Sequence, residues 1–350
     1  MKEEKPSDNE NVKNRSRDSS SHAVTLHVTD VYKWLEMIVA VEKASLRKAH
    51  WGGEEILGPK WVYRGQANST WSIRSTYERN VLDSVPNVLR NKELILWEKE
   101  RAALLHFQQW VDISMQDRPS TKGEWLALMQ HYGVPTRLVD FTEVPLHALG
   151  FALEDDKENG DFAIWMVPCS SPNCGFAEAQ RSSQAKKNKR AMLWSDTLAY
   201  RVESDEFDRR NLEDLLSNGH NEREAGLLRY LPIGMSGRQK RQKGLFMAST
   251  RLSEGFMPLL HKWTRTSPDD FDDAELKIEL KDVLKSTSST VKVWFDQTIA
   301  NARLIKCVFD KKLRDDTKVL LRCCNITGST RYGSIEKLAE ETKSLMQEGV

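Results

Sequence analysis

The pattern of apolar and polar positions predicts helices in the first part of the chain. Apolar side chains between residues 34 and 41 recur at helical spacing, and Thr29 or Asp30 precedes them as a suitable N-cap. A longer amphipathic pattern extends from about residue 91 to 111. A third helix is expected in "GEWLALMQHYG", where Gly133 takes the left-handed conformation that ends many helices.

Short runs of β-branched and aromatic residues predict strands between and after these helices. "KWVYRG" at residues 60–65 stops at a glycine, and "DFAIWMVP" at residues 161–168 is apolar enough for a buried strand. Further strands are expected in "GLFMAST" and "ARLIKCVFD", and a closing helix in "SIEKLAEETKSLM". The mixture predicts an α+β fold, with a mixed sheet core and surrounding helices.

One folded domain behind a polar tail is the expected organisation. Residues 1–22 combine low hydrophobicity with mixed charge, so we expect a disordered tail. Residues 23–350 are expected to form a single α+β domain. Its core motifs lie within residues 60–338, and residues 169–190 are expected to be a polar insertion.

Charge and cysteine content narrow the function classes. The 52 basic and 51 acidic residues give a formal net charge of +1, which argues against a uniformly basic nucleic-acid coat. The five cysteines have no regular framework spacing, which favours a reducing, cytoplasmic setting. No apolar run reaches the ~18 residues of a membrane span. The cysteine pairs lack further zinc ligands, so no metal site is expected.

The segment "LMQHYGVPTRLVDFTEVP", residues 128–145, carries an unusual density of polar chemistry. Residues 134–141 are expected to form a loop between two helices, with Thr142 as the N-cap of the second helix. Pro135 fixes its own φ, and the apolar neighbours can pin the loop to the core. The sequence therefore predicts a rigid loop that presents polar groups.

Three side chains of this segment are suited to binding or catalysis. Arg137 can grip a phosphate or a carboxylate with two parallel hydrogen bonds. Asp140 can orient that guanidinium, bind a ribose hydroxyl or act as a base. His131 lies in a last helical turn, where the helix dipole favours a charged imidazole. The alternative is that Arg137 and Asp140 are a structural pair that ties the loop shut.

A second group of polar residues follows the predicted strand at residues 60–65. "VYRGQANSTW" places Arg64 and Gln66 at the strand end, and Gly65 lets the backbone approach a ligand closely. Trp71 offers a stacking face, so the group suits a nucleotide-like ligand. The alternative is a strand exit with a solvated arginine.

Together these motifs resemble the FRG domain family. "YRGQ" at residues 63–66 and "WSIRSTYER" at 71–79 are similar to its opening elements, and "MQHYGVPTRLVDFTEVPLHALGFAL" at 129–153 is similar to its central signature. "RQKGLFMAS" resembles a later element and singles out Gln242, Gly244 and Phe246. "RLIKCVFDKKL" resembles the start of the closing elements, so the resemblance extends over about residues 60–338.

The resemblance implies a bacterial or phage-associated protein in a toxin or defence setting. The Y-R-G strand is similar to the first motif of arginine-class ADP-ribosyltransferases, so the fold is expected to be ADP-ribosyltransferase-like. In those enzymes the strand arginine holds the NAD phosphates, which is the role implied for Arg64, and NAD is the implied substrate. Ser249 and Thr250 are weak candidates to support the nicotinamide ribose. No E-x-E or Q-x-E element follows them at a suitable spacing, so Asp140 is the candidate carboxylate.

These expectations converge on one cleft. The predicted catalytic residues are Arg64, His131, Arg137 and Asp140. The predicted ligand-binding residues are Gln66, Trp71, Gln130, Thr136, Thr142, Gln242, Gly244 and Phe246. The function predicted from them is that of an NAD- or nucleotide-directed effector, with ADP-ribosyltransferase-like or NAD-cleaving chemistry.

Two other classes of function stay open. A non-catalytic nucleic-acid or nucleotide-binding module would use the basic runs at residues 185–190 and 238–243. A regulatory interaction module would use its polar loops only to stabilise the fold. An antitoxin or another defence protein is the protein partner that the resemblance implies, and no membrane partner is expected.

Overall fold

The computed structural model describes a little more than half of the chain. The described residues are 23–45, 48–51, 54–57, 60–111, 118–154, 158–170, 209–217, 225–232, 243–264, 266, 278–279, 304–328 and 330. Several predictions lie outside them: the tail at residues 1–22, the basic run at 185–190, Gln242 with most of the run at 238–243, and the closing helix. Most of the predicted insertion at 169–190 also lies outside the described residues.

A mixed β-sheet is the centre of the described fold, which confirms the predicted α+β class. Its order is β7-β8-β5-β4-β6-β10-β1-β9. The strands are β1 (Val24–Val28), β4 (Lys60–Gln66), β5 (Leu138–Thr142), β6 (Phe162–Ser170), β7 (Leu227–Tyr230), β8 (Gly244–Ser249), β9 (Ile278–Glu279) and β10 (Ile305–Phe309). β1 runs parallel to β9 and β10, and the other neighbours are antiparallel. β2 (Lys48–Trp51) and β3 (Glu54–Leu57) form a separate hairpin.

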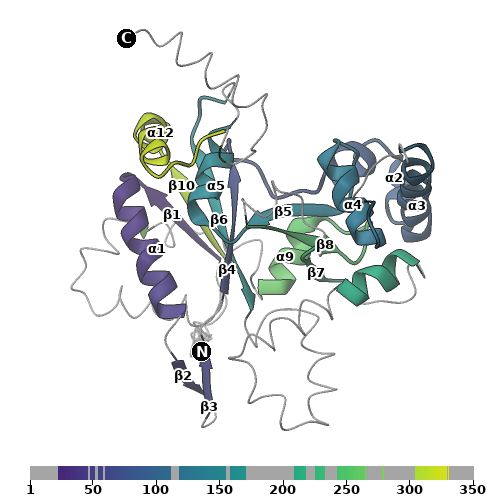
Figure 1. The fold of residues 1–350 in the computed structure, drawn as a ribbon, viewed down its shortest axis with the longest axis horizontal. Helices are drawn as coiled ribbons and strands as arrows, with labels where there is room; N and C mark the ends of the chain where they lie inside the picture. The colour runs from purple at the N-terminus through teal and green to yellow at the C-terminus, as the bar shows by residue number, and fades with distance from the viewer. Residues whose placement is uncertain are drawn as a thin grey trace, which may run out of the picture.

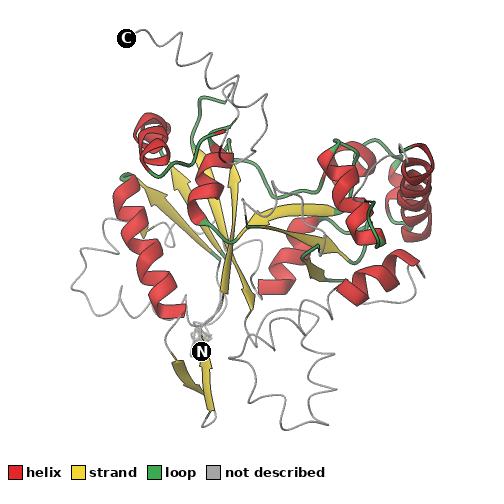
Figure 2. Ribbon diagram, viewed as in Figure 1, coloured by secondary structure: helices red, strands yellow, loops and turns green. Residues whose placement is uncertain are grey.

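Helices lie on both sides of the strands, as Figure 2 shows. They are α1 (Val31–Ser45), α2 (Asn87–Arg90), α3 (Glu93–Trp110), α4 (Lys122–His131), α5 (Pro145–Ala152), a helix over residues 209–217, α9 (Phe256–Thr264) and α12 (Arg314–Cys323). Two further short helical turns are Glu78–Leu82 and Lys311–Leu313. Most of the predicted helices and strands are thus confirmed within one or two residues.

Alternation along the strands divides the core between the two faces of the sheet. α1, α5 and α12 pack against β1, β4, β6 and β10 in one apolar cluster. On β5, Leu138 contributes to a cluster with α3, α4 and the helix at 209–217, whereas Val139 contributes to a cluster with α9. Successive side chains of a strand point to opposite faces, so α9 covers the face opposite α4.

The sheet is split between β4 and β5. β4 pairs with β6 along its whole length, and β5 pairs with β8 at five positions. Between β4 and β5, the only paired residues are Tyr63 and Thr142. In Figure 1, β5 and β8 accordingly run across the direction of β4 and β6. The backbone groups beyond that one pair therefore face a gap where two sheet halves diverge.

The prediction of a loop over residues 134–141 is wrong in its second half. Leu138–Thr142 form strand β5, with buried residues on both sides of Asp140. Thr142 is also not the N-cap of the following helix, because that position belongs to Val144, with Pro145 in the first turn. The physical reason is that Leu138, Val139 and Phe141 are buried on both faces, so they extend as a strand rather than pin a loop.

Two predicted helix ends are confirmed. The side chain of Asp30 accepts hydrogen bonds from the backbone N–H groups of Tyr32 and Lys33, at 2.8 and 3.2 Å, at the start of α1. Gly133 has a φ of +80° directly after α4, the left-handed conformation expected of it.

Gly65, which was predicted to let the backbone approach a ligand, is required for helix packing. A Cβ atom on Gly65 would lie 1.9 Å from the carbonyl oxygen of Ala148 and 2.7 Å from the amide nitrogen of Ala152. Both are backbone atoms of α5, so they cannot rotate away as a flexible side chain would. The absence of a side chain at position 65 therefore sets how closely α5 approaches β4.

We expect Gly65→Ala to lower the free energy of unfolding by about 1–3 kcal/mol or more, because α5 must move away from the sheet. Urea unfolding followed by circular dichroism measures this loss. Gly160→Ala is the matched control, since a Cβ atom there meets nothing within 4 Å. Equal stability of the two variants would contradict the assigned close packing.

Candidate functional site

A pocket of about 320 Å³ opens where the two halves of the sheet diverge. Its walls come from β4, β5 and β8 and from the C-terminal ends of α4 and α5. The lining residues are Tyr63, Arg64, Gly65, Ala127, Gln130, His131, Asp140, Phe141, Phe151, Glu154, Gly244, Leu245 and Phe246. Five elements, from three separate parts of the sequence, thus contribute residues to one concave surface.

Arg64 is the cation of this pocket. Its Nη1 donates a 2.6 Å hydrogen bond to the backbone carbonyl oxygen of Asp140. In a continuous sheet a neighbouring strand would satisfy that acceptor, so the guanidinium bridges the split between β4 and β5. The buried Nε has no hydrogen-bond partner among the described residues. A partly buried guanidinium therefore retains donor capacity beside the pocket.

Electrostatics around Arg64 favour an anion. Burial lowers the pKa of this guanidinium; the nearby charge of Asp140 acts in the opposite direction, and the positive charge of Arg79 lowers the pKa further. The hydrogen bond from Arg64 goes to the carbonyl group of Asp140, not to its carboxylate. A bound anion would add the stabilisation that burial and the second cation remove.

Asp140 is held by a chain of hydrogen bonds that begins in the helical segment after β4. Its Oδ2 accepts a 2.7 Å hydrogen bond from Nε2 of Gln130, whose Oε1 in turn accepts one from the hydroxyl of Thr136. Thr136 is fully buried, and its backbone N–H donates to Oγ1 of Thr76 at 2.9 Å. Thr136 thus positions Gln130, and Gln130 positions the carboxylate of Asp140 at the pocket.

His131 and Glu154 add two titratable side chains. His131 is exposed at the end of α4, with its ring edge-on to Tyr132 at 5.1 Å between centroids. Glu154 is exposed just after α5 and was not predicted from the sequence. The pocket therefore combines one guanidinium with two carboxylates and an imidazole.

Arg137 lies elsewhere, in the core. It is fully buried, and its Nε donates to both carboxylate oxygens of Glu100 at 3.0 and 2.8 Å, with a further short contact from Nη2. Its Nη1 donates to the carbonyl oxygen of Ser249 at 3.0 Å. Arg137 does not line the pocket. It ties the start of β5 to α3 and to the end of β8, a structural arrangement.

Glu100 could have been found from the spacing of apolar residues. Leu96, Glu100 and Leu104 are four residues apart and lie on the buried stripe of α3. A carboxylate on such a stripe needs a buried cation, because an unpaired charge in the core is strongly destabilising. The spacing therefore predicts a buried partner such as Arg137.

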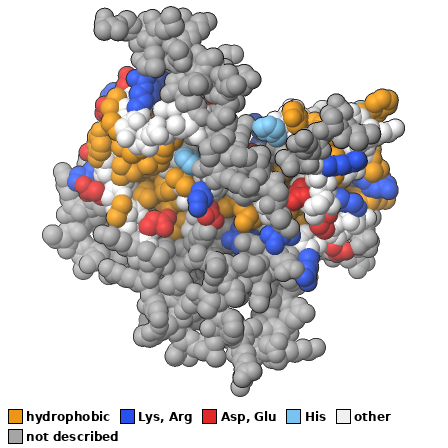
Figure 3. Space-filling view, in the orientation of Figure 1, with side chains coloured by type: hydrophobic (Ala, Val, Ile, Leu, Met, Phe, Trp, Pro, Cys, Tyr) orange, Lys and Arg blue, Asp and Glu red, His pale blue; other side chains and the backbone are white. Residues whose placement is uncertain are grey.

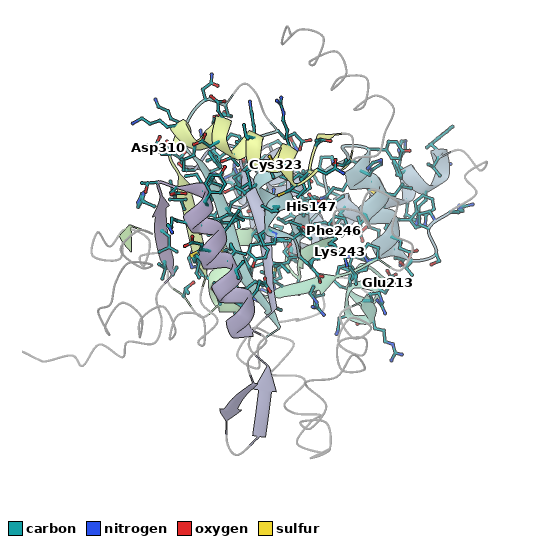
Figure 4. The ribbon with its side chains drawn as sticks, turned by 60° about the vertical axis from the view of Figure 1, so that its left-hand side comes forward. His147, Glu213, Lys243, Phe246, Asp310 and Cys323 are labelled. Carbon is teal, nitrogen blue, oxygen red and sulfur yellow. The ribbon has the colours of Figure 1, made fainter. Side chains whose placement is uncertain are left out.

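The remaining predicted ligand-binding residues divide between the pocket and its surroundings. Gly244 and Phe246 line the pocket, and Figure 4 shows Phe246 on β8 with Lys243 just before the strand. Gln66 is buried; its Nε2 donates to the carbonyl oxygen of Ser72, and its Oε1 accepts from the indole of Trp165.

Trp71 and Thr142 also lie outside the pocket lining. Trp71 is 44% exposed, and Thr142 is buried with Oγ1 accepting a 3.1 Å hydrogen bond from the backbone N–H of Val144. The structure thus brings together Arg64, Gln130, His131, Asp140, Gly244 and Phe246. Gln66, Trp71, Thr136, Arg137 and Thr142 do not line the same surface.

Three broader observations concern metals, membranes and charge. Within the described residues, no group of three His, Cys, Asp or Glu side chains is arranged to hold a metal ion. No helix in that part of the chain is both long and apolar enough to cross a membrane. On the face drawn in Figure 3, described basic and acidic side chains are interspersed rather than gathered by sign.

The fold and pocket define an α+β protein with a split mixed sheet and a polar pocket at the split. Residues 59–161 match the FRG domain, and the match contains β4, α4, β5 and α5, which carry most of the pocket. This stretch of the chain is therefore similar to the FRG domain, the family that its motifs resemble. No curated protein and no solved structure matches the chain. The later predicted motif around Gly244 and Phe246 lies beyond the matched residues.

Proposed function

We propose that this FRG-domain protein is an enzyme that binds NAD or a related nucleotide in the pocket and cleaves it at the ribose. The observation that carries the proposal is Arg64, a partly buried guanidinium with an unpartnered Nε at the edge of a polar pocket. Such a group is suited to a phosphate oxygen, which accepts charge-assisted hydrogen bonds.

The surroundings of Arg64 support a ligand larger than a single anion. The pocket volume of about 320 Å³ lies within the range typical of small-molecule sites. Phe151 and Phe246 supply apolar surface, and Gln130 and Asp140 supply hydrogen-bonding groups. A phosphate with a sugar and a base attached has polar and apolar parts that match this division.

The proposed chemistry is cleavage of the bond between the ribose C1′ and the nicotinamide nitrogen. Nicotinamide leaves with the bonding electron pair, and positive charge develops on the ribose. The carboxylate of Asp140, oriented by Gln130, is suited to stabilise that charge. Arg64 would hold the phosphates so that the ribose faces Asp140.

A toxin or phage-defence effector in a bacterial cytoplasm is the setting we propose for this activity. Consumption or transfer of a nucleotide is harmful to the cell that contains the enzyme. An antitoxin or another defence protein would then regulate the exposed pocket. This part of the proposal rests on the match to the FRG domain and on the sequence resemblance of the Y-R-G strand to the first motif of arginine-class ADP-ribosyltransferases.

Release of nicotinamide from NAD by the purified protein, followed by chromatography, tests the proposal. We expect Asp140→Asn to lower the turnover rate by about 10²–10³-fold, because it removes one oriented charge. Binding of ADP-ribose, measured by calorimetry, should change much less. Asp316→Asn, an exposed aspartate on α12, is the matched control and should retain activity.

Two other outcomes would contradict NAD cleavage or favour a different function. No nicotinamide release from NAD and no binding in a panel of nucleotides would contradict the proposal. DNA and RNA binding at increasing salt would then test the alternative of a nucleic-acid-binding module, for which strong salt dependence is diagnostic.

A further inference from the structure

Two carboxylates enter the pocket from different elements. Asp140 lies in the middle of β5, and Glu154 follows the C-terminal end of α5. α5 is fixed against β4 by the contact at Gly65, and the backbone N–H of Glu154 donates to the carbonyl oxygen of Phe151 at 3.4 Å. A ligand in the pocket thus meets a carboxylate from a strand and a second one from a helix end.

The surroundings of the two carboxylates differ. Asp140 accepts a hydrogen bond from Gln130 and lies in the field of Arg64. The side chain of Glu154 is exposed and makes no hydrogen bond or ion pair with the other described residues. Both oxygens of Glu154 are therefore accessible to a water molecule in the pocket, whereas Oδ2 of Asp140 is already oriented by its hydrogen bond from Gln130.

We infer that Glu154 is the general base that activates the attacking water, which makes the enzyme an NAD hydrolase. The inference rests on the proposed function. The bond from C1′ to the nicotinamide nitrogen breaks, and the electron pair leaves with nicotinamide. The water oxygen bonds to C1′, and its proton passes to the carboxylate of Glu154. The products are nicotinamide, ADP-ribose and one proton, which is later released to solvent.

The reaction needs two carboxylates in different roles, one to stabilise positive charge and one to act as the general base. A group that stabilises positive charge must stay negative, so it should not take a proton during the reaction. A general base must take one. Asp140, held by Gln130 and close to Arg64, suits the first role, and Glu154, exposed to water, suits the second.

Turnover of NAD and binding of ADP-ribose by Glu154→Gln test the inference. We expect turnover to fall by about 10²–10⁴-fold, the usual contribution of a general base, with ADP-ribose affinity within about twofold of wild type. Glu154→Ala should regain turnover when formate is added, because a free carboxylate can replace the missing base. Glu98→Gln, an exposed glutamate on α3, is the matched control and should keep full activity.

The outcomes separate this inference from the proposed function. If Asp140→Asn abolishes turnover while Glu154→Gln retains it, the assignment of Glu154 is overturned and the proposed NAD cleavage stands. If Glu154→Gln loses ADP-ribose binding together with turnover, and formate rescues nothing, Glu154 contributes to binding and the general-base role is overturned. If wild type releases no nicotinamide, the proposed cleavage fails, and the general-base role fails with it.

Discussion

Replacing Arg137 with leucine is expected to lower the free energy of unfolding by about 3–5 kcal/mol, the largest stability effect we predict. Arg137 and Glu100 are both almost completely buried, and the guanidinium donates at least three hydrogen bonds to Glu100 and Ser249. Leucine leaves the carboxylate of Glu100 in the core without its cation. An uncompensated buried charge is far more costly than the loss of the pair as a whole.

A double variant distinguishes the buried charge from the lost contacts. Arg137→Leu combined with Glu100→Leu removes both charges, so we expect it to recover a large part of the stability lost in the single variant. Urea unfolding measures all the differences. Arg101→Leu, on the same helix as Glu100, is the control. The ion pair between Arg101 and Glu98 is exposed and should contribute about 0–1 kcal/mol. Equal losses for Arg137→Leu and Arg101→Leu would contradict the structural role of Arg137.

Sequence patterns predicted the fold where an element is long or strongly apolar. β4, α3, α4 and β6 were predicted within a few residues, because periodicity and end signals agree along their whole length. β5 was missed because it has only five residues, and Pro135 and Pro145 close by suggested a loop. The pairing of β5 with β8 decides its conformation, and that contact is between residues about a hundred positions apart in the sequence.

Only some of the residues predicted for the site line the pocket. Gln130, His131 and Asp140 are close in sequence, and the end of α4 and the middle of β5 bring them to one pocket. Arg64 and Arg137 were both predicted to be catalytic, since each lies in a motif beside apolar residues and either suits a phosphate. Their difference comes from Glu100, which is 37 residues away from Arg137 in the sequence.

Glu154 was missed for another reason. It belongs to the acidic run "EDDKENGD", residues 154–161, which reads as a solvated helix exit. Only the packing of α5 on β4 singles out the first residue of that run as part of the pocket. Charge runs in a sequence therefore conceal a functional carboxylate when tertiary packing alone selects it.

Replacing Arg64 with leucine is expected to have the opposite profile to the Arg137 variant. Nucleotide affinity should fall by about 10–100-fold, because a charge-assisted hydrogen bond contributes about 1.5–3 kcal/mol. The free energy of unfolding should stay within about 1 kcal/mol of wild type. Arg64 loses one hydrogen bond to the carbonyl oxygen of Asp140, and that acceptor faces a pocket that water can enter.

Calorimetric titration with ADP-ribose and urea unfolding of the same samples test both halves of this prediction. Arg64→Lys keeps the charge but loses the planar fork, so its affinity should lie between those of leucine and wild type. Arg79→Leu should weaken binding less than Arg64→Leu, since Arg79 contributes charge from an exposed position. If Arg64→Leu unfolds as readily as Arg137→Leu and still binds ADP-ribose, Arg64 is a structural bridge across the split sheet. Loss of binding in a fully stable Arg64→Leu protein would instead mean that the partly buried guanidinium at the split in the sheet binds a ligand and does not stabilise the fold.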